Sequence, residues 1–329
     1  MKNNTKLLDV KNLRTAFNVE GKDVTVVNDV SFDLSPGEIV GLVGESGCGK
    51  SVTALSLMGL VPDPPGKILG GEIFLEGKDL LKFSESDMEK VRGKEIGMIF
   101  QEPMTSLNPV LTIGKQITEI LELHQEMNEE EATKEAVELL KLVGLPDPEL
   151  RINDHPHQLS GGQRQRIMIA IALSCKPKVL IADEPTTALD VTIQAQILEL
   201  IQKLSNELGT SVILITHNLG ILARYASKIN VMYAGHLIES GSTDEIFYNP
   251  KHPYTAGLLN SVPRLDLDPN IELPTIKGEV PNLAEFHEGC IFNSRCPNPT
   301  KECIEGKSEM GLIEIEPDHW VDKCCVNCK

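Results

Sequence analysis

The chain has 329 residues, of which 41% are hydrophobic, so it is long enough for one large domain or two smaller domains with a substantial core. Its formal net charge is −17, from 31 basic and 48 acidic residues, which argues against a nucleic-acid-binding surface. The longest apolar runs, such as 167–173, are too short to span a bilayer, and the first ten residues lack the apolar core of a signal peptide. These features predict a soluble protein that stays in the cytoplasm.

The N-terminal part reads as strands that lead into a helix. Residues 6–34 alternate in polarity and are rich in valine, which predicts antiparallel strands around a turn at Gly21. An apolar run at 38–43 predicts a buried strand, and the residues from Ser51 onward predict a helix. Residues 62–71 are expected to form a loop before a further short strand.

Between the strand at 38–43 and the helix lies GESGCGKS, which matches the P-loop pattern G-x-x-x-x-G-K-[ST]. Its glycines allow tight turns that point backbone N–H groups at phosphate oxygens, and the helix N-terminus adds positive potential. Lys50 is expected to reach the β- and γ-phosphates, and the Ser51 hydroxyl to ligate Mg²⁺. A glycine-rich turn without a ligand is the alternative, which the flanking strand and helix disfavour. The predicted nucleotide-binding residues of this loop are Gly44, Glu45, Ser46, Gly47, Cys48, Gly49, Lys50, Ser51 and Val52.

The middle of the chain alternates strands with helices. Residues 96–100 predict a strand, and a helical pattern from Thr112 predicts a helical insert at about 102–165. LSGGQRQR at 159–166 opens another apolar helix. Two more buried strands are predicted at 178–183 and 211–216, with the amphipathic helix 191–208 between them. This alternation predicts a parallel sheet built from βαβ units.

Polar residues follow the predicted parallel strands at their carboxyl ends, where α/β sheets bind ligands. Their positions come from separated parts of the sequence, which is difficult to explain by packing alone. The residues at these strand ends are Gly44, Gln101, Asp183, Glu184 and His217.

After Gly241 the chain becomes rich in proline and loses its periodicity, so we expect a separate C-terminal appendage. Six of the eight cysteines fall in the last 40 residues, and in a cytosolic chain such clustering indicates metal binding before disulfides. Cys48 and Cys175 are expected to be a loop residue and a small buried hydrophobe. The clustered cysteines are Cys290, Cys296, Cys303, Cys324, Cys325 and Cys328.

The spacing of the first three clustered cysteines is C-x5-C-x6-C, and twenty residues separate Cys303 from Cys324. Four thiolates suit either a four-iron four-sulfur cluster or a tetrahedral zinc ion. The short C-x2-C pair that is typical of zinc ribbons is absent from this spacing. The residues alone therefore leave both metals open, with disulfides or free thiols as the remaining alternatives.

In order and spacing, GESGCGKS, Gln101, LSGGQ, VLIADE, ALD and His217 resemble the motifs of ABC-type ATPases over roughly residues 6–245. The chain is identified as a member of the ATP-binding subunits of ABC transporters. This resemblance implies an α/β fold: a P-loop NTPase parallel sheet with an antiparallel β subdomain, a helical insert subdomain and a small cysteine-rich C-terminal extension. It also implies that ATP and Mg²⁺ are cofactors, and that two nucleotides are sandwiched between two subunits.

The resemblance implies a role for each motif residue. Asp183 would hold Mg²⁺ directly or through water, and Glu184 would polarise the attacking water as general base. Gln101 would contact Mg²⁺ and that water, and His217 would contact the γ-phosphate. The remaining residues have roles at the base or in a second subunit: Phe17 on the adenine, although an ordinary core phenylalanine is the alternative; Ser160, Gly161 and Gly162 at the γ-phosphate of the other subunit's ATP; and Asp190 bridging the two sites.

The C-terminal region of the sequence resembles one subgroup of these ATPases. Residues 246–263 and 289–303 are similar to the C-terminal extension of oligopeptide and dipeptide transporter ATPases, with nickel importers as close relatives. We therefore expect an ABC ATPase domain at 1–245 and an extension at 246–329. The group implies a four-iron four-sulfur cluster, with zinc as the alternative. Its expected ligands are Cys290, Cys296, Cys303 and Cys324; Cys325 and Cys328 compete for the fourth position, and His319 is an outside candidate.

The implied partners are a second ATPase subunit, often a different chain, and two transmembrane permease subunits, with an extracytoplasmic substrate-binding protein acting indirectly. The implied location is the cytoplasmic face of the cell membrane. Two other readings are weaker. A soluble ABC ATPase acting on DNA or ribosomes would carry a coiled coil or two cassettes, and an exporter subunit fits the core but not the tail.

Overall fold

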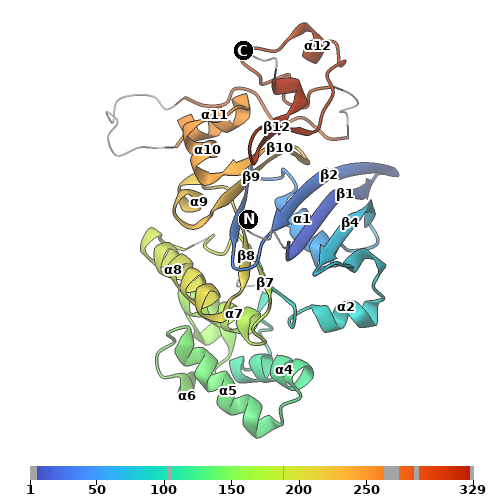
Figure 1. Cartoon of the computed structure of the whole chain (residues 1–329). Coiled ribbons are helices and arrows are strands. Elements are labelled where there is room, and N and C mark those ends of the chain that lie inside the picture. Colours follow the sequence, from blue (N-terminus) through green and yellow to red (C-terminus); the bar gives the residue numbers. More distant parts are fainter. Residues whose placement is uncertain (1–5, 103–105, 188, 263–273, 285–288, 327–329) are drawn as a thin grey trace. The chain divides into compact units, whose positions relative to one another are not determined.

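A computed structural model describes residues 6–102, 106–187, 189–262, 274–284 and 289–326 (Figure 1). Contacts divide the chain into two compact units, each made of discontinuous segments. We call residues 35–38 and 82–215 the helical unit. Residues 6–34, 39–81 and 216–329 form the P-loop unit.

The P-loop unit contains an antiparallel sheet in the order β2-β1-β4-β5. The predicted antiparallel pair at its N-terminus is confirmed, because β1 (Leu8–Val19) pairs with β2 (Lys22–Leu34) around Gly21. The loop expected at 62–71 is partly wrong, since β4 (Gly66–Leu75) begins inside it and pairs with β1. Glycines at the start of β4 weaken its strand signal. The short β5 (Lys78–Asp79) completes the sheet.

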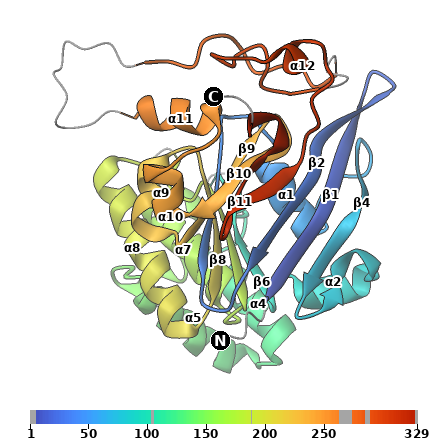
Figure 2. The same cartoon turned by 45° about the horizontal axis from the view of Figure 1, so that its top comes forward.

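A second set of strands in the P-loop unit has the order β11-β12-β10-β9-β3. β3 (Ile39–Val43) pairs in parallel with β9 (Lys228–Tyr233), and β9 pairs antiparallel with β10 (His236–Ser242). The C-terminal strands β11 (Leu312–Glu316) and β12 (His319–Asp322) extend this sheet through β10 (Figure 2). Part of the C-terminal extension is thus built onto the strands of the ATPase region.

The helices of the P-loop unit flank these strands. α1 follows the P-loop and α9 follows β8, while the others belong to the C-terminal region, which sequence periodicity did not resolve into elements. The helices of this unit are α1 (Lys50–Leu57), α9 (Leu219–Tyr225), α10 (Thr243–Tyr248), α11 (Pro253–Asn260) and α12 (Lys301–Ile304).

The helical unit contains the parallel strands β6 (Ile96–Ile99), β7 (Val179–Asp183) and β8 (Ser211–Thr216, whose last residue falls in the other unit). Every residue of β7 and β8 is buried, as expected for a parallel sheet covered on both faces. The predicted order of strands and helices is confirmed here. The helices are α2 (Glu85–Val91), α4 (Ile113–Gln125), α5 (Glu129–Leu142), α6 (Pro148–Arg151), α7 (Gly161–Leu173) and α8 (Val191–Leu208).

The helical insert is an α4–α5 pair that also contacts α7. Buried apolar residues three and four positions apart, such as Ile117 and Leu121 of α4 and Ala136 and Leu140 of α5, form the facing surfaces. Gly144 lies just past α5 at φ +71°, where a glycine ends the helix without strain.

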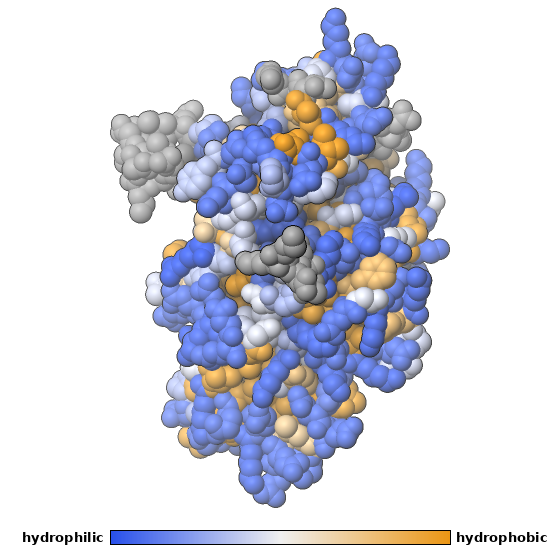
Figure 3. Space-filling model, in the orientation of Figure 1, coloured by the Kyte–Doolittle hydropathy of each residue, from blue (hydrophilic) through white to orange (hydrophobic). Residues whose placement is uncertain are grey.

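The face of the molecule seen in Figure 3 is mostly polar. Figure 3 shows hydrophilic residues over most of one face, with hydrophobic residues in small patches between them, in keeping with the net charge of −17. Among the described helices, none combines the length and hydrophobicity that a membrane crossing requires.

Candidate nucleotide site

The P-loop joins the end of β3 to the start of α1, as the sequence predicts. At two of its glycines no residue with a side chain fits. A Cβ on Gly44 would lie 2.1 Å from the Met232 carbonyl oxygen, and a Cβ on Gly49 would lie 2.6 Å from the Val26 carbonyl oxygen. Gly49 also has φ +104°. The backbone therefore approaches β2 and β9 more closely than any side chain permits.

Lys50 begins α1 and is only 5% exposed. Its ammonium donates hydrogen bonds to the carbonyl oxygens of Gly44, at 2.9 Å, and Glu45, at 3.0 Å. The loop backbone thus fixes where the positive charge lies. Cys48 is buried, and burial raises the pKa of its thiol, so it adds no negative charge beside the phosphate-binding loop.

Glu45 makes contacts that sequence reasoning missed. Its carboxylate accepts two hydrogen bonds from the Arg295 guanidinium, at 2.9 and 3.1 Å. Its backbone N–H donates to the Tyr254 hydroxyl at 2.9 Å. Both partners belong to the C-terminal extension, more than 200 residues away in sequence, and no local motif signals such a contact.

In the helical unit the structure brings Gln101 and Glu184 together. The Gln101 amide donates to the Glu184 carboxylate at 3.1 Å, and the Thr187 hydroxyl donates to the same oxygen at 3.0 Å. Glu184 has φ +46°, and its N–H donates to the Ile215 carbonyl at 2.9 Å, which holds it at the end of β7. A non-glycine residue held in the left-handed region is typical of functional sites.

Asp183 is the last residue of β7 and is 4% exposed. Ser51 lies half-buried in the first turn of α1, in the other unit. Each of these residues offers a hard oxygen donor of the kind that Mg²⁺ prefers: the Ser51 hydroxyl, the Gln101 amide and the Asp183 carboxylate. Taken one by one, their donor atoms suit magnesium by their chemistry.

The LSGGQ motif forms the N-terminus of α7. The Ser160 hydroxyl accepts from the Gln163 N–H at 3.3 Å, and the Gln163 side chain accepts from the Ser160 N–H at 2.9 Å. This is a capping box, and Gly161 and Gly162 fill the first helical turn without side chains. The N–H groups of Gly161 and Gly162 lie at the helix start, where they have no partner within the helix, and this suits the predicted contact with a γ-phosphate.

Asp190 caps α8 beside this turn. Its carboxylate accepts from the Ile193 N–H at 3.0 Å. A Cβ on Gly162 would lie 3.3 Å from the Ile193 side chain, so the start of α7 packs closely against the start of α8. The predicted bridging role of Asp190 between two subunits stays a prediction.

The roles predicted for Phe17 and His217 stay predictions. Phe17 is half-buried at the end of β1, and a Cβ on Gly66 would lie 2.8 Å from its ring. The glycine therefore lets the ring pack against β4. His217 is exposed directly after β8.

Four cysteines of the C-terminal extension belong to the P-loop unit, and the structure brings two of them, Cys290 and Cys324, into contact. Cys290, Cys303 and Cys324 are buried and Cys296 is half-buried, and the sulfurs of Cys324 and Cys290 are 3.2 Å apart. The hydrogen-bonded neighbour Cys324 and burial raise the pKa of Cys290 well above its usual range. Burial raises the pKa of Cys296, and the nearby Cys290 and Cys303 raise it further. Because a bound cation stabilises thiolates, this buried thiol group is chemically suited to a metal centre.

Several residues near Cys324 remain candidates for the fourth ligand of the predicted metal site. Cys325 lies 3.6 Å from Cys324. Cys324, Cys325 and His252 have ligand atoms that all lie within 4.8 Å of one another, whereas Cys328 lies outside the described residues. Both ring nitrogens of His319 face carboxylates, with Nε2 at 2.9 Å from Glu239 and Nδ1 at 3.3 Å from Glu245.

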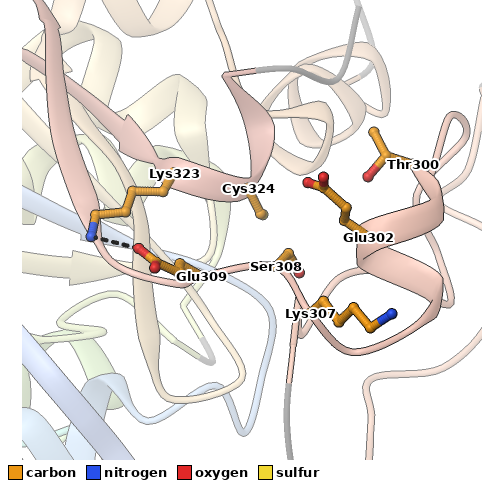
Figure 4. Close-up of a pocket in the computed structure, with 7 residues that line it drawn as sticks. All are labelled: Thr300, Glu302, Lys307, Ser308, Glu309, Lys323 and Cys324. Atoms are coloured by element: carbon orange, nitrogen blue, oxygen red, sulfur yellow. Dashed lines mark hydrogen bonds and ion pairs between the residues drawn. The ribbon is translucent and has the colours of Figure 1, made fainter.

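A pocket of about 410 Å³ borders the cysteine group on one side. Figure 4 shows Cys324 on the pocket wall between Lys323 and two residues at the start of α12, its N-cap Thr300 and Glu302, with Lys323 paired to Glu309 at 3.3 Å. The Thr300 hydroxyl also donates to the Cys303 sulfur at 3.1 Å. Cys324 is thus the member of the cysteine group that lines this pocket.

Comparison with known proteins places these features in a family. Residues 27–187 match the family model of the ABC transporter, and residues 238–303 match that of the oligopeptide/dipeptide transporter C-terminal region. The chain is 52% identical over 317 residues to the oligopeptide transport ATP-binding protein OppD of Bacillus subtilis (strain 168), covering 96% of this chain and 88% of that protein. It is 53% identical over 298 residues to the dipeptide transport ATP-binding protein DppD of the same organism, covering 91% and 89%.

A solved structure of an ATP-binding cassette has the same fold as part of this chain. The dimeric ATP-binding cassette MJ0796, in a post-hydrolysis state bound to ADP and Pi, matches with a TM-score of 0.65 and 29% identity, covering 72% of this chain and 98% of that chain. The predicted ABC ATPase fold is therefore confirmed. With a similarity that spans nearly its whole length, the chain belongs to the ABC transporter ATP-binding proteins of the oligopeptide/dipeptide transporter family.

Proposed function

We propose that this chain binds and hydrolyses ATP to power an ABC importer of dipeptides or oligopeptides across the cytoplasmic membrane. One observation carries the proposal: the similarity to OppD and DppD extends through the C-terminal extension and covers at least 91% of the chain. The extension separates this family from other ABC ATPases, and it bears the family match at residues 238–303.

The chemistry is phosphoryl transfer to water. Lys50 and the P-loop N–H groups would bind the phosphates, and Ser51, Gln101 and Asp183 would hold Mg²⁺, which neutralises phosphate charge when it is bound. Glu184, oriented by Gln101 and Thr187, would accept a proton from the attacking water. His217 would contact the γ-phosphate, and Phe17 would stack on the adenine.

Hydrolysis would require a second ATPase subunit. Ser160, Gly161, Gly162 and Asp190 would act on the ATP bound by the partner, so one chain alone would hydrolyse slowly. The relative MJ0796 has been solved as a dimer. We propose a heterodimer with a related chain, docked on two permease subunits at the cytoplasmic face of the membrane and supplied by an extracytoplasmic substrate-binding protein.

We also propose a four-iron four-sulfur cluster on Cys290, Cys296, Cys303 and Cys324. The burial of Cys290, Cys303 and Cys324 and the 3.2 Å between the sulfurs of Cys290 and Cys324 support it. Absorption spectra and metal analysis of anaerobically purified protein test it. Absorbance near 400 nm that bleaches with dithionite, with about four irons per chain, supports the cluster. A colourless protein with about one zinc replaces it with a structural zinc site.

Uptake by cells tests the transport function. A host strain that lacks this chain should lose uptake of radiolabelled di- to pentapeptides, and the wild-type chain but not Lys50→Ala should restore it. Nickel uptake in the same strains is the control. Loss of nickel uptake with normal peptide uptake would reassign the protein to nickel import.

A further inference from the structure

The contact between Glu45 and the C-terminal extension points to a role for the extension in ATP binding. We propose that Arg295 is a positioning residue of the P-loop: it holds and neutralises Glu45, and so makes the affinity for ATP depend on the extension. The inference rests on the proposed ATPase function. It concerns contacts within the P-loop unit alone.

The ion pair between Arg295 and Glu45 has the geometry of a strong interaction. Two guanidinium nitrogens of Arg295 donate to the two carboxylate oxygens of Glu45, at 2.9 and 3.1 Å. The Arg295 side chain is 5% exposed and that of Glu45 is 28% exposed. Bidentate pairs shielded from water are stronger and more directional than pairs on the surface.

Further hydrogen bonds hold Arg295 in place. Its Nε donates to the Lys277 carbonyl and its Nη2 to the Ile276 carbonyl, both at 3.2 Å. The guanidinium lies 5.7 Å from the centre of the Tyr233 ring. Burial lowers the pKa of Arg295, but the hydrogen bonds with Glu45 raise it, so that it lies above its ordinary value and the side chain stays charged. The guanidinium is thus preorganised to receive one carboxylate.

An aromatic cluster supports the same side of the P-loop. The ring centres of Tyr233 and Tyr254 are 4.6 Å apart, and Phe292 packs on both, at 5.2 and 5.7 Å. All three side chains are fully buried. The Tyr254 hydroxyl accepts the Glu45 N–H, so this cluster also fixes the backbone of Glu45.

Glu45 links these contacts to the phosphate-binding lysine. Lys50 donates to the carbonyl oxygens of Gly44 and Glu45, so a displacement of Glu45 also displaces a partner of Lys50. The Glu45 carboxylate is a negative charge on a loop that must accept phosphates. Without Arg295 this charge would repel ATP, and the P-loop would lose the ion pair that holds the Glu45 side chain in place.

Arg295 stands in a turn between two of the clustered cysteines. The Arg295 and Cys296 N–H groups donate to the Phe292 carbonyl at 3.0 and 2.9 Å, and the Asn293 N–H donates to the Cys290 carbonyl at 3.1 Å. The turn that presents the guanidinium therefore begins and ends at cysteines. This connects the state of the cysteine group to the P-loop by covalent structure.

Binding of Mg²⁺–AMP-PNP, measured by titration calorimetry on the full-length chain, tests the proposal. We expect Arg295→Gln to weaken binding about tenfold, because it leaves the Glu45 charge without its partner. Arg295→Lys keeps the charge but loses the second hydrogen bond, so we expect a loss of about threefold. The matched control is Lys251→Gln, which breaks an exposed ion pair with Glu316 in the same extension and should change affinity less than twofold.

A suppressor variant separates this role from a merely structural one. If Arg295 acts through the charge of Glu45, then Glu45→Gln added to Arg295→Gln should recover most of the lost affinity, to within about threefold of wild type. A variant that only disturbs folding would not be rescued by a change in the P-loop. Should Arg295→Gln lose the native fluorescence of Trp320, Arg295→Lys takes its place in the comparison.

Two results would overturn the proposal: wild-type affinity in both Arg295 variants, or no recovery in the double variant. Failure of the wild-type chain to bind the nucleotide would instead contradict the proposed ATPase function, so the two failures are distinguishable.

Discussion

At the scale of single residues, Glu184 has the most constrained position in the helical unit's part of the site. Its backbone is held in the left-handed region, and its carboxylate accepts from Gln101 and Thr187. Left-handed backbone costs a non-glycine residue about 1 kcal/mol or more, which the surrounding hydrogen bonds must offset. A carboxylate fixed at that cost is well placed to orient a water molecule.

Glu184→Gln should therefore separate binding from hydrolysis. The amide keeps the shape of the side chain but cannot accept a proton, so we expect phosphate release by the assembled transporter to fall by about a hundredfold or more. Nucleotide binding should remain near wild type. Glu207→Gln, at an exposed position near the end of α8, is the matched control. More than half of the wild-type hydrolysis rate in Glu184→Gln would exclude this residue as the base.

Residues within local motifs were the ones that sequence could predict. The P-loop, Asp183 and Glu184 stand beside strong strand signals, so their placement at strand ends follows from short-range pattern. Arg295 could not be predicted as a partner of Glu45, because 250 residues separate them. Such a contact depends on tertiary packing, which has no local signature.

At the scale of elements, helix α7 combines a structural cap with a predicted binding turn. The capping box between Ser160 and Gln163 satisfies two N–H groups of the first turn. Helix α5 carries the same device, with Asn128 as the cap and Glu131 as its reciprocal partner. The two helices lie in the same unit, so they form a natural pair for comparison.

Ser160→Ala and Asn128→Ala should differ in function although they remove similar caps. Each should destabilise its helix by about 1 kcal/mol, measured by urea unfolding. Only Ser160→Ala should lower ATP hydrolysis by the assembled dimer, by about tenfold. Neither should alter nucleotide binding by the isolated chain, because the LSGGQ turn acts on the partner's nucleotide. Weakened binding in the isolated Ser160→Ala chain would contradict action across the dimer.

Element prediction succeeded where the apolar pattern was long or continuous and failed where it was short and interrupted. The amphipathic α8 was predicted with its observed bounds, since it has eighteen residues. β11 and β12 were missed, because charged or polar residues interrupt their short sequences, LIEIE and HWVD. The strand predicted here was shorter than the observed β4, because the glycines at its start weaken the strand signal. Pairing with β1 overrides that local preference.

At the scale of the molecule, the compact units do not follow the order of the chain. The P-loop unit joins the N-terminal strands to the C-terminal extension, whereas the helical unit is mostly the continuous segment 82–215. The boundary predicted at 245 stays a proposal, and the contacts cross it through β10 and β12. Sequence composition identified the extension by its prolines and cysteines, but pairing between distant strands lies beyond what composition encodes.

Metal removal tests how far the extension depends on its cysteines. Because it has few apolar runs, we expect chelation under reducing conditions to loosen the extension and leave the ATPase core folded. Trp320, the only tryptophan in the sequence, lies on β12 and reports on the extension. Its fluorescence transition should fall by about 10 °C or more, while the main circular-dichroism transition stays close to that of the untreated protein. Readdition of the metal should restore the first transition. If both signals instead shift together, the pairing of β12 with β10 makes the extension part of one cooperative unit with the core.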